Sequence, residues 1–129
     1  MAKVRAVYEA LDARKHKLAL KLLTPLLEKK PDNSQLRILK ALSLVRLGNK
    51  DEALKIGREL KSLKEVENDE HLLNNLAIVF REGGAPTEAT ECFVSAWEKQ
   101  PQNEDLGLCV FAAYGKERNF LKQQQVAHP

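Results

Sequence analysis

The fold of this chain is decided by residues 36–60, which read LRILKALSLVRLGNKDEALKIGREL. The first half is apolar except for four polar residues spaced three apart, Arg37, Lys40, Ser43 and Arg46. On a helix these form one narrow stripe, so most of the circumference is apolar and must be covered on several sides. Gly48 then interrupts the pattern where a helix C-terminus favours the left-handed conformation, and a second apolar series follows. The stretch therefore predicts a helical hairpin that needs neighbours before and after it.

Length and composition fit one helical domain. The 129 residues suffice for one core and are too few for two ordinary domains. Hydrophobic residues make up 43% and charged residues 30%, which argues against disorder, and only 5% are aromatic. Apolar runs stay short of the roughly 18 residues of a membrane span, and the N-terminus does not read as a secretory signal. We therefore expect a cytoplasmic protein with no membrane partner.

Three kinds of marker recur at intervals of 34 to 36 residues, or twice that: Ala19, Ala53 and Ala89; Gly48 and Gly84; Pro31 and Pro101. Each has a packing reason, because alanine lets two helices approach closely, glycine reverses the chain and proline ends a helix. Such a period is typical of a solenoid of helical hairpins. We expect a single segment over residues 1–129, about three and a half repeats, with units of about 1–31, 32–69, 70–103 and a partial 104–129.

Helices are expected within these units at about 4–11, 17–30, 36–47, 51–64, 70–82 and 87–100, and again from residue 104. Residues 65–69 read as a charged connector, and Pro25 predicts a local bend rather than a break. Gly115 and the polar residues after it should separate the last helix from a glutamine-rich stub. Because a solenoid needs a terminal cap, we expect the N-terminal part of a longer superhelix, or a truncated form of one.

The third unit resembles a tetratricopeptide (TPR) repeat in its residues Ala77, Phe80, Gly84, Ala89, Phe93, Ala96 and Pro101. The second unit matches at Ala41, Leu44, Gly48, Ala53 and Leu60. It carries Gly57 where the family usually has an aromatic residue, and the first unit shows Arg14 in place of the turn glycine. The resemblance implies an all-α fold, a right-handed TPR-type α-solenoid of antiparallel helix pairs.

Five short blocks resemble the N-terminal region of the non-catalytic subunits of N-terminal acetyltransferase B (NatB) complexes. They are VYEALD at 7–12, LKALSLVRLG at 39–48, EAL at 52–54, FRE at 80–82 and FAAY at 111–114. The resemblance implies a cytosolic scaffold around a separate catalytic acetyltransferase subunit. That partner transfers an acetyl group from acetyl-CoA to nascent chains that begin Met-Asp, Met-Glu, Met-Asn or Met-Gln. Catalytic and cofactor-binding residues belong to the partner, so for this chain we expect no enzyme activity and no cofactor.

The residues themselves also argue against an active site. His16, His71 and His128 form no i, i+4 pair and lack the glutamate of a metal motif. Gly83 and Gly84 lack the lysine of a phosphate loop, so they read as a helix-ending turn. Carboxylate pairs fall at helix starts, where capping explains them. We therefore expect no catalytic or metal site and no small-molecule substrate, with Cys92 and Cys109 as buried free thiols.

Binding through the first helices is the stronger hypothesis. In a solenoid of this kind these helices line the concave face, on which we expect Val4, Tyr8, Ile38, Leu42, Val45, His71, Asn75 and Ile78. An apolar groove of this kind suits a helical or extended partner segment, unless neighbouring repeats already bury the side chains. A clamp for a C-terminal carboxylate is excluded, because the matching positions contain no lysine.

The N-terminal unit is basic, with eight Lys or Arg against three Asp or Glu over residues 1–31. The ribosome is therefore a second expected partner, met through Lys3, Arg5, Arg14, Lys15, Lys17 and Lys21. A merely solvated face is the alternative. The period also fits repeats that read RNA bases, although the glycine, alanine and proline markers favour protein binding. Two hypotheses remain: an acetyltransferase scaffold, and a stand-alone adaptor for a helical or extended peptide or, less favoured, RNA.

Overall fold

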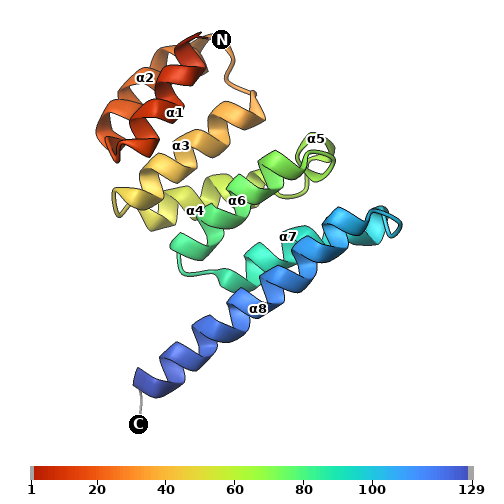
Figure 1. Ribbon diagram of the computed structural model, residues 1–129. Helices are drawn as coiled ribbons and strands as arrows, with labels where there is room; N and C mark the ends of the chain where they lie inside the picture. The colour runs from red at the N-terminus through yellow and green to blue at the C-terminus, as the bar shows by residue number, and fades with distance from the viewer. Residues whose placement is uncertain (1, 128–129) are drawn as a thin grey trace.

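The computed structural model describes residues 2–127, with side-chain surroundings over residues 3–118. Figure 1 shows that this part of the chain is entirely helical. Its helices are α1 (Ala2–Asp12), α2 (His16–Lys29), α3 (Ser34–Arg46), α4 (Lys50–Leu60), α5 (Lys64–Glu67), α6 (Glu70–Glu82), α7 (Pro86–Lys99) and α8 (Glu104–Ala127). The predicted all-α class is confirmed. None of the described helices has the length and apolarity needed to cross a membrane.

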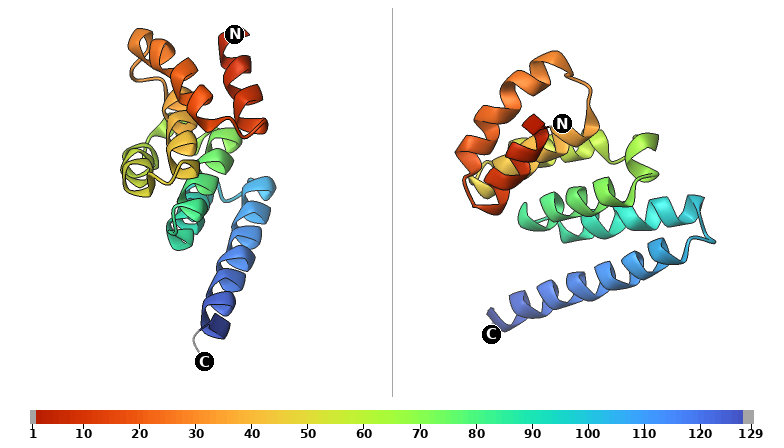
Figure 2. Two further views of the ribbon diagram at one scale, coloured as in Figure 1. Left: turned by 90° about the vertical axis from the view of Figure 1, so that its left-hand side faces the viewer. Right: turned by 45° about the horizontal axis from the view of Figure 1, so that its top comes forward.

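The helices stack as antiparallel neighbours. Helices α1 and α2, α3 and α4, and α6 and α7 pack as pairs, and contacts of α2 with α3, α3 with α6, and α7 with α8 join the pairs. Figures 1 and 2 show the resulting stack, with α1 and α2 at one end and α8 at the other. The marker alanines Ala19, Ala53 and Ala89 are fully buried in it. The predicted solenoid of helix pairs is therefore confirmed.

Each first helix after α1 begins with the same cap. The side-chain oxygens of Asn33, Asp69 and Asn103 accept hydrogen bonds from the backbone N–H three residues on, at 3.0, 3.3 and 3.2 Å. Such caps satisfy donors that a helix start leaves unpaired. The three caps therefore mark equivalent starting points of α3, α6 and α8.

The turn between paired helices also repeats. Gly48 and Gly84 have φ values of +95° and +87°, the left-handed conformation that the sequence predicted for Gly48. Arg14 has a φ of +60° at the matching place in the first unit. An arginine therefore takes a conformation that glycine adopts at lower cost.

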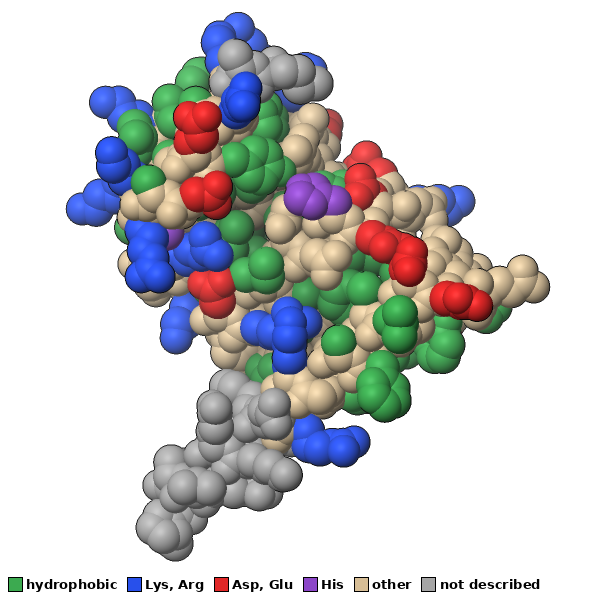
Figure 3. Space-filling view, in the orientation of Figure 1, with side chains coloured by type: hydrophobic (Ala, Val, Ile, Leu, Met, Phe, Trp, Pro, Cys, Tyr) green, Lys and Arg blue, Asp and Glu red, His purple; other side chains and the backbone are tan. Residues whose placement is uncertain are grey.

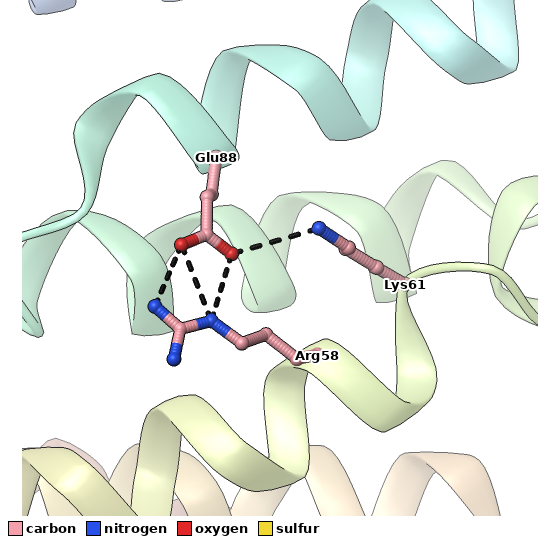
Figure 4. A network of polar contacts seen from close by, with 3 residues as sticks. All are labelled: Arg58, Lys61 and Glu88. Carbon is pink, nitrogen blue, oxygen red and sulfur yellow. Dashed lines mark hydrogen bonds and ion pairs between the residues drawn. The ribbon is translucent and has the colours of Figure 1, made fainter.

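Ion pairs connect the second helices. Glu88 of α7 accepts hydrogen bonds from the Arg58 guanidinium of α4, the shortest at 2.7 Å, and its other oxygen lies 3.6 Å from Lys61 Nζ (Figure 4). Arg58 and Lys61 raise the stability of the ionised carboxylate, so the pKa of Glu88 lies below its ordinary value, with the Arg58 hydrogen bond as the largest cause. The α4–α7 contact is thus polar at its surface.

Two boundary predictions are wrong. Helix α4 ends at Leu60 rather than near Lys64, and part of the expected connector forms the one-turn helix α5. The reason is tertiary, because Val66 is fully buried in the core and Glu67 is buried beside Lys99, with which it forms an ion pair. Helix α2 continues through Pro25 without a break, as expected.

The expected break at Gly115 is also wrong, since α8 runs unbroken from Glu104 to Ala127. Gly115 has no heavy atom within 4 Å of where a Cβ would lie, and it does not take a positive φ. The neighbouring Lys116, Glu117 and Arg118 are good helix formers, which offset the modest cost of a helical glycine. His128 and the last residues of the fourth unit lie outside the described residues.

Candidate partner-binding face

A polar cluster joins the first helices of three successive units. We call Tyr8, Gln35, His71 and Asn75 the polar cluster; they come from α1, α3 and α6. Gln35 Nε2 donates a hydrogen bond to Tyr8 Oη at 2.9 Å. Tyr8 Oη lies 3.5 Å from His71 Nε2, which in turn lies 3.4 Å from Asn75 Nδ2. The Tyr8 and His71 rings are tilted by 43° with centroids 6.4 Å apart. Residues far apart in sequence thus form one continuous row.

The polar cluster is accessible. His71 is exposed, and Tyr8, Gln35 and Asn75 are half-buried. Amide, phenol and imidazole groups can donate or accept hydrogen bonds. The half-buried Val4 and Ile78 lie on the same first helices, α1 and α6. This face can therefore offer a partner both hydrogen bonds and a limited apolar contact.

The face is narrower and more polar than the sequence predicted. Ile38, Leu42 and Val45 were expected on it, but they are only 0%, 6% and 4% exposed. Their predicted exposure is wrong, because α3 lies inside the stack with α2, α4 and α6 packed around it. The structure brings Tyr8, His71 and Asn75 together and removes these three apolar residues from the surface.

Gln35 was missed by the sequence analysis. It precedes Ile38 by three residues and Leu42 by seven, so helical periodicity places it on the same side of α3. That spacing is the signal that would have found it. Its position at the start of α3, beyond the fully packed middle of the helix, leaves its amide half-buried and within reach of Tyr8.

All six basic residues predicted to contact RNA are exposed. Figure 3 shows Lys and Arg side chains gathered around α1 and α2, with a few acidic side chains among them. The residues come from α1, the following turn and α2: Lys3, Arg5, Arg14, Lys15, Lys17 and Lys21. Arg5 Nε lies 3.7 Å from a carboxylate oxygen of Glu9. The N-terminal unit therefore presents a positively charged surface.

An open cleft of about 650 Å³ lies where the turn of the first unit meets the ends of α3 and α6. Its lining consists of Leu11, Asp12, Arg14, His16, Val45, Arg46 and Glu82. Arg46 and Glu82 form an ion pair across it at 3.2 Å. His16 is half-buried, and its Nδ1 has no hydrogen-bond partner among the described residues. Because the opposite charges of Arg46 and Glu82 already pair with each other, the cleft does not indicate a particular ligand.

The next question is whether the described residues could hold a metal ion or provide a reactive thiol. Within residues 3–118, no three His, Cys, Asp or Glu side chains are placed to hold a metal ion. Cys92 is buried and Cys109 is half-buried, and both are free thiols. Burial raises the pKa of Cys92 to about 12, so its thiol is protonated at neutral pH.

Comparison with known proteins gives a consistent result. The family model described as Psidin, N-terminal TPR repeats region, matches residues 2–129. The N-terminal acetyltransferase B complex auxiliary subunit of Arabidopsis thaliana is 38% identical over 129 residues, which cover 97% of this chain and 12% of that protein. N-alpha-acetyltransferase 25, the NatB auxiliary subunit of Homo sapiens, is 31% identical over 123 residues, which cover 95% of this chain and 12% of that protein.

A relative with a different name also matches. The phagocyte signaling-impaired protein of Drosophila pseudoobscura pseudoobscura is 30% identical over 125 residues, covering 97% of this chain and 13% of that protein. The chain therefore spans only 12–13% of the length of these relatives. The predicted resemblance to TPR repeats and to the N-terminal region of NatB auxiliary subunits is confirmed. The chain belongs to the family of Psidin N-terminal TPR repeats regions.

Proposed function

We propose that this chain is part of a non-catalytic scaffold subunit of a NatB-type N-terminal acetyltransferase complex and binds the catalytic subunit in the cytoplasm. Family membership over residues 2–129 and the auxiliary-subunit names of the relatives support this proposal. The scaffold contributes no active site. Acetyl-CoA is bound by the catalytic subunit, which acetylates nascent chains beginning Met-Asp, Met-Glu, Met-Asn or Met-Gln.

The observation that carries the binding role is the polar cluster. Its four side chains come from three helices and already contact one another, so we expect less side-chain entropy to be lost when a partner binds. The amides of Gln35 and Asn75 match the backbone groups of an extended or helical segment. His71 is the exposed member and the natural first contact.

The test is co-purification of this chain with the catalytic acetyltransferase subunit, followed by a titration that measures the dissociation constant. Replacing Gln35, His71 and Asn75 together by Ala should weaken binding by about tenfold or more, because partner hydrogen bonds are lost. The matched control replaces Asn49, Lys50 and Lys55 by Ala; these residues are exposed at the start and in the middle of α4, a helix that contributes no residue to the cluster. Its affinity should match the wild type.

Two results would contradict the proposal in different ways. If the chain and the catalytic subunit elute separately, this segment does not bind the catalytic subunit. The hypothesis that the protein is a stand-alone adaptor is then favoured. If the triple variant binds as tightly as the control, the partner uses another face. Recovery of other proteins and no acetyltransferase subunit would likewise favour the adaptor.

A ribosome contact is the second function proposed, favoured by the exposure of all six basic residues in the N-terminal unit. Lysine and arginine release counterions when they meet phosphates, so such a contact weakens as salt rises. Changing Arg14, Lys15 and Lys17 to Glu should reduce co-sedimentation with ribosomes. Changing Lys50, Lys55 and Lys64 to Glu alters the net charge equally at exposed positions elsewhere and should not. Equal co-sedimentation of the two variants rejects the contact.

A further inference from the structure

Arg81, near the end of α6, is a partly buried cation without a counterion in the described part of the chain. Its side chain is half-buried, and burial alone lowers the pKa of its guanidinium, with no contribution from a carboxylate. The guanidinium stays protonated, because an arginine pKa lies far above neutral pH. Residues 119–129 contain no Asp or Glu, so no acidic side chain follows the described range. A charge removed from water is normally paired, so the position of Arg81 needs an explanation.

The other arginines show that this position is unusual. Four of them form ion pairs: Arg5 with Glu9, Arg37 with Glu59, Arg46 with Glu82, and Arg58 with Glu88. Arg14 and Arg118 are exposed, so water solvates them. Arg46 is the best comparison, because like Arg81 it lies in the last turn of a first helix, where the helix dipole favours a cation. The dipole therefore explains a basic residue at Arg81 but not the missing carboxylate.

Arg81 shares one side of α6 with the accessible residues of that helix. Asn74, Ile78 and Arg81 are spaced by four and three residues, which places them in a row along the helix. Asn74 is exposed and Ile78 is half-buried. We call these three residues the α6 stripe. His71 of the polar cluster precedes Asn74 by three residues, so the α6 stripe continues the proposed partner-binding face toward the end of α6.

The missing carboxylate is not expected from a further unit of the stack. Helix α2 packs on α1 and α3, α4 on α3 and α6, and α7 on α6 and α8. Each second helix thus contacts the first helix of its own unit and that of the following unit, but not that of the preceding one. A second helix paired with α8 would by this rule not reach α6, and repeats in a solenoid contact only their neighbours. A bound partner is therefore the source that the packing leaves for the counterion.

We propose that Arg81 binds the carboxylate of an Asp or Glu side chain of the catalytic subunit, in a segment that lies along the α6 stripe. A guanidinium presents its N–H donors in a planar fork that matches the two oxygens of a carboxylate. Asn74 Nδ2 already donates to the carbonyl of Glu70 at 2.9 Å, so its Oδ1 remains to accept from a backbone N–H of the segment. Ile78 offers an apolar contact. The proposal rests on the scaffold function and specifies one contact that holds the partner.

The experiment measures the dissociation constant of the whole chain and the catalytic acetyltransferase subunit by titration at low and high salt. Arg81→Gln should weaken binding by about tenfold, and Arg81→Glu by more, because the second change places two carboxylates together. The wild-type affinity should fall as salt rises, and Arg81→Gln should make that fall smaller. Lys55→Gln removes one charge from an exposed position on α4 and should bind like the wild type.

Stability of the chain alone separates a partner contact from a role in the fold. Arg81→Gln loses the interaction with the helix dipole but leaves no carboxylate of the described residues without its partner. Arg46→Gln loses the same kind of interaction and also breaks the ion pair with Glu82. Arg81→Gln should therefore lower the midpoint of urea unfolding no more than Arg46→Gln does. A larger decrease would assign Arg81 to the fold and overturn the proposal.

A charge exchange identifies the partner residue. With Arg81→Glu in the chain, the exposed Asp and Glu residues of the catalytic subunit are changed to Arg one at a time, and one change should restore affinity by about tenfold or more. A wild-type complex that Arg81→Glu leaves intact, or the absence of a restoring change, overturns this proposal alone. If the wild type forms no complex, the proposal fails together with the scaffold function.

Discussion

Arg14 and Gly48 share the left-handed backbone conformation at the same point of successive helix pairs, with φ of +60° and +95°. For a residue with a Cβ this conformation costs about 1 kcal/mol or more in free energy, whereas glycine adopts it without that cost. The first unit therefore keeps the turn geometry of the others with a less suitable residue. Its turn is a local weak point in an otherwise regular stack.

Arg14→Gly should accordingly stabilise the chain. We expect a gain of about 0.5–1 kcal/mol in the free energy of unfolding, measured by urea denaturation with an unchanged m-value. The reverse change, Gly48→Arg, should cost about 1 kcal/mol. A Cβ at Gly48 would have no heavy atom within 4 Å, so that loss is conformational and not steric. A destabilised Arg14→Gly variant would show that the arginine side chain contributes more than its backbone costs.

Gly57 is the second departure from the TPR pattern, and Phe80 explains it. A Cβ at Gly57 would lie 3.1 Å from Phe80 Cζ and 3.4 Å from Leu76 Cδ1. Phe80 from the next unit therefore fills the space of the missing aromatic. Gly57→Leu should destabilise the chain by about 1–3 kcal/mol through overpacking.

Coupling distinguishes this explanation from a general loss of packing. Phe80→Ala alone should cost about 3–5 kcal/mol, and the double variant Gly57→Leu with Phe80→Ala should lose clearly less than the sum. Gly57→Leu combined with Leu23→Ala is the control, because Leu23 lies in the other core cluster. Those two losses should add. Additive losses for Gly57 and Phe80 would reject the direct contact.

The features that the sequence predicted correctly are local ones. Turn glycines and helix caps act within one or two turns, so Gly48 and Gly84 could be predicted from their neighbours in the chain, and the buried Ala53 from its place in the 34–36-residue repeat. Even Arg14 could be placed, because the repeat assigns it the position of a glycine. The short helix α5 could not, since the burial of Val66 depends on helices distant in sequence.

The candidate face shows the same division. Helical periodicity placed Tyr8, His71 and Asn75 on one side of the stack, and the structure brings them together. Helical periodicity could not show that Ile38, which shares that side, is fully buried by the neighbouring helices. Gln35 shares that side by its spacing from Ile38 and Leu42, but its hydrogen bond to Tyr8, 27 residues away in the sequence, could not be predicted. Exposure is thus decided by the stacking of units, which a single repeat does not reveal.

Glu88 should make the α4–α7 contact sensitive to acid. Its folded pKa lies below the ordinary value, chiefly through the Arg58 hydrogen bond. A lowered folded pKa gives stability that is present above the unfolded pKa and is lost as the pH falls through the folded pKa. Glu88→Gln should therefore destabilise the chain at about pH 7 and do so less at about pH 3. Urea unfolding at several pH values measures this.

The matched control for this prediction is Glu91→Gln, which removes one charge from an exposed position on the same helix. It should leave the free energy of unfolding nearly unchanged at both pH values. If the Glu88 and Glu91 variants show the same dependence on pH, the ion pairs with Arg58 and Lys61 contribute nothing beyond general charge.

The two cysteines should differ in reactivity, because their surroundings differ. Cys92 is 3% exposed, and burial raises its pKa to about 12. Relative to an ordinary thiol with a pKa near 9, it then forms about a thousandfold less thiolate. Cys109 is half-buried on α8, and its pKa is raised by burial first and then by Glu70 and Asp105. In the native chain Cys109 should react with a thiol reagent slowly, and Cys92 only after unfolding.

Single substitutions assign the two phases in a colorimetric thiol assay. Cys109→Ser should remove the reaction of the native chain and leave one thiol that appears in urea. Cys92→Ser should keep the native reaction and lose the later one, provided that circular dichroism shows an unchanged fold. A fast native reaction in the Cys109→Ser variant would mean that α7 opens at the buried Cys92 far more readily than its packing against α6 and α8 indicates.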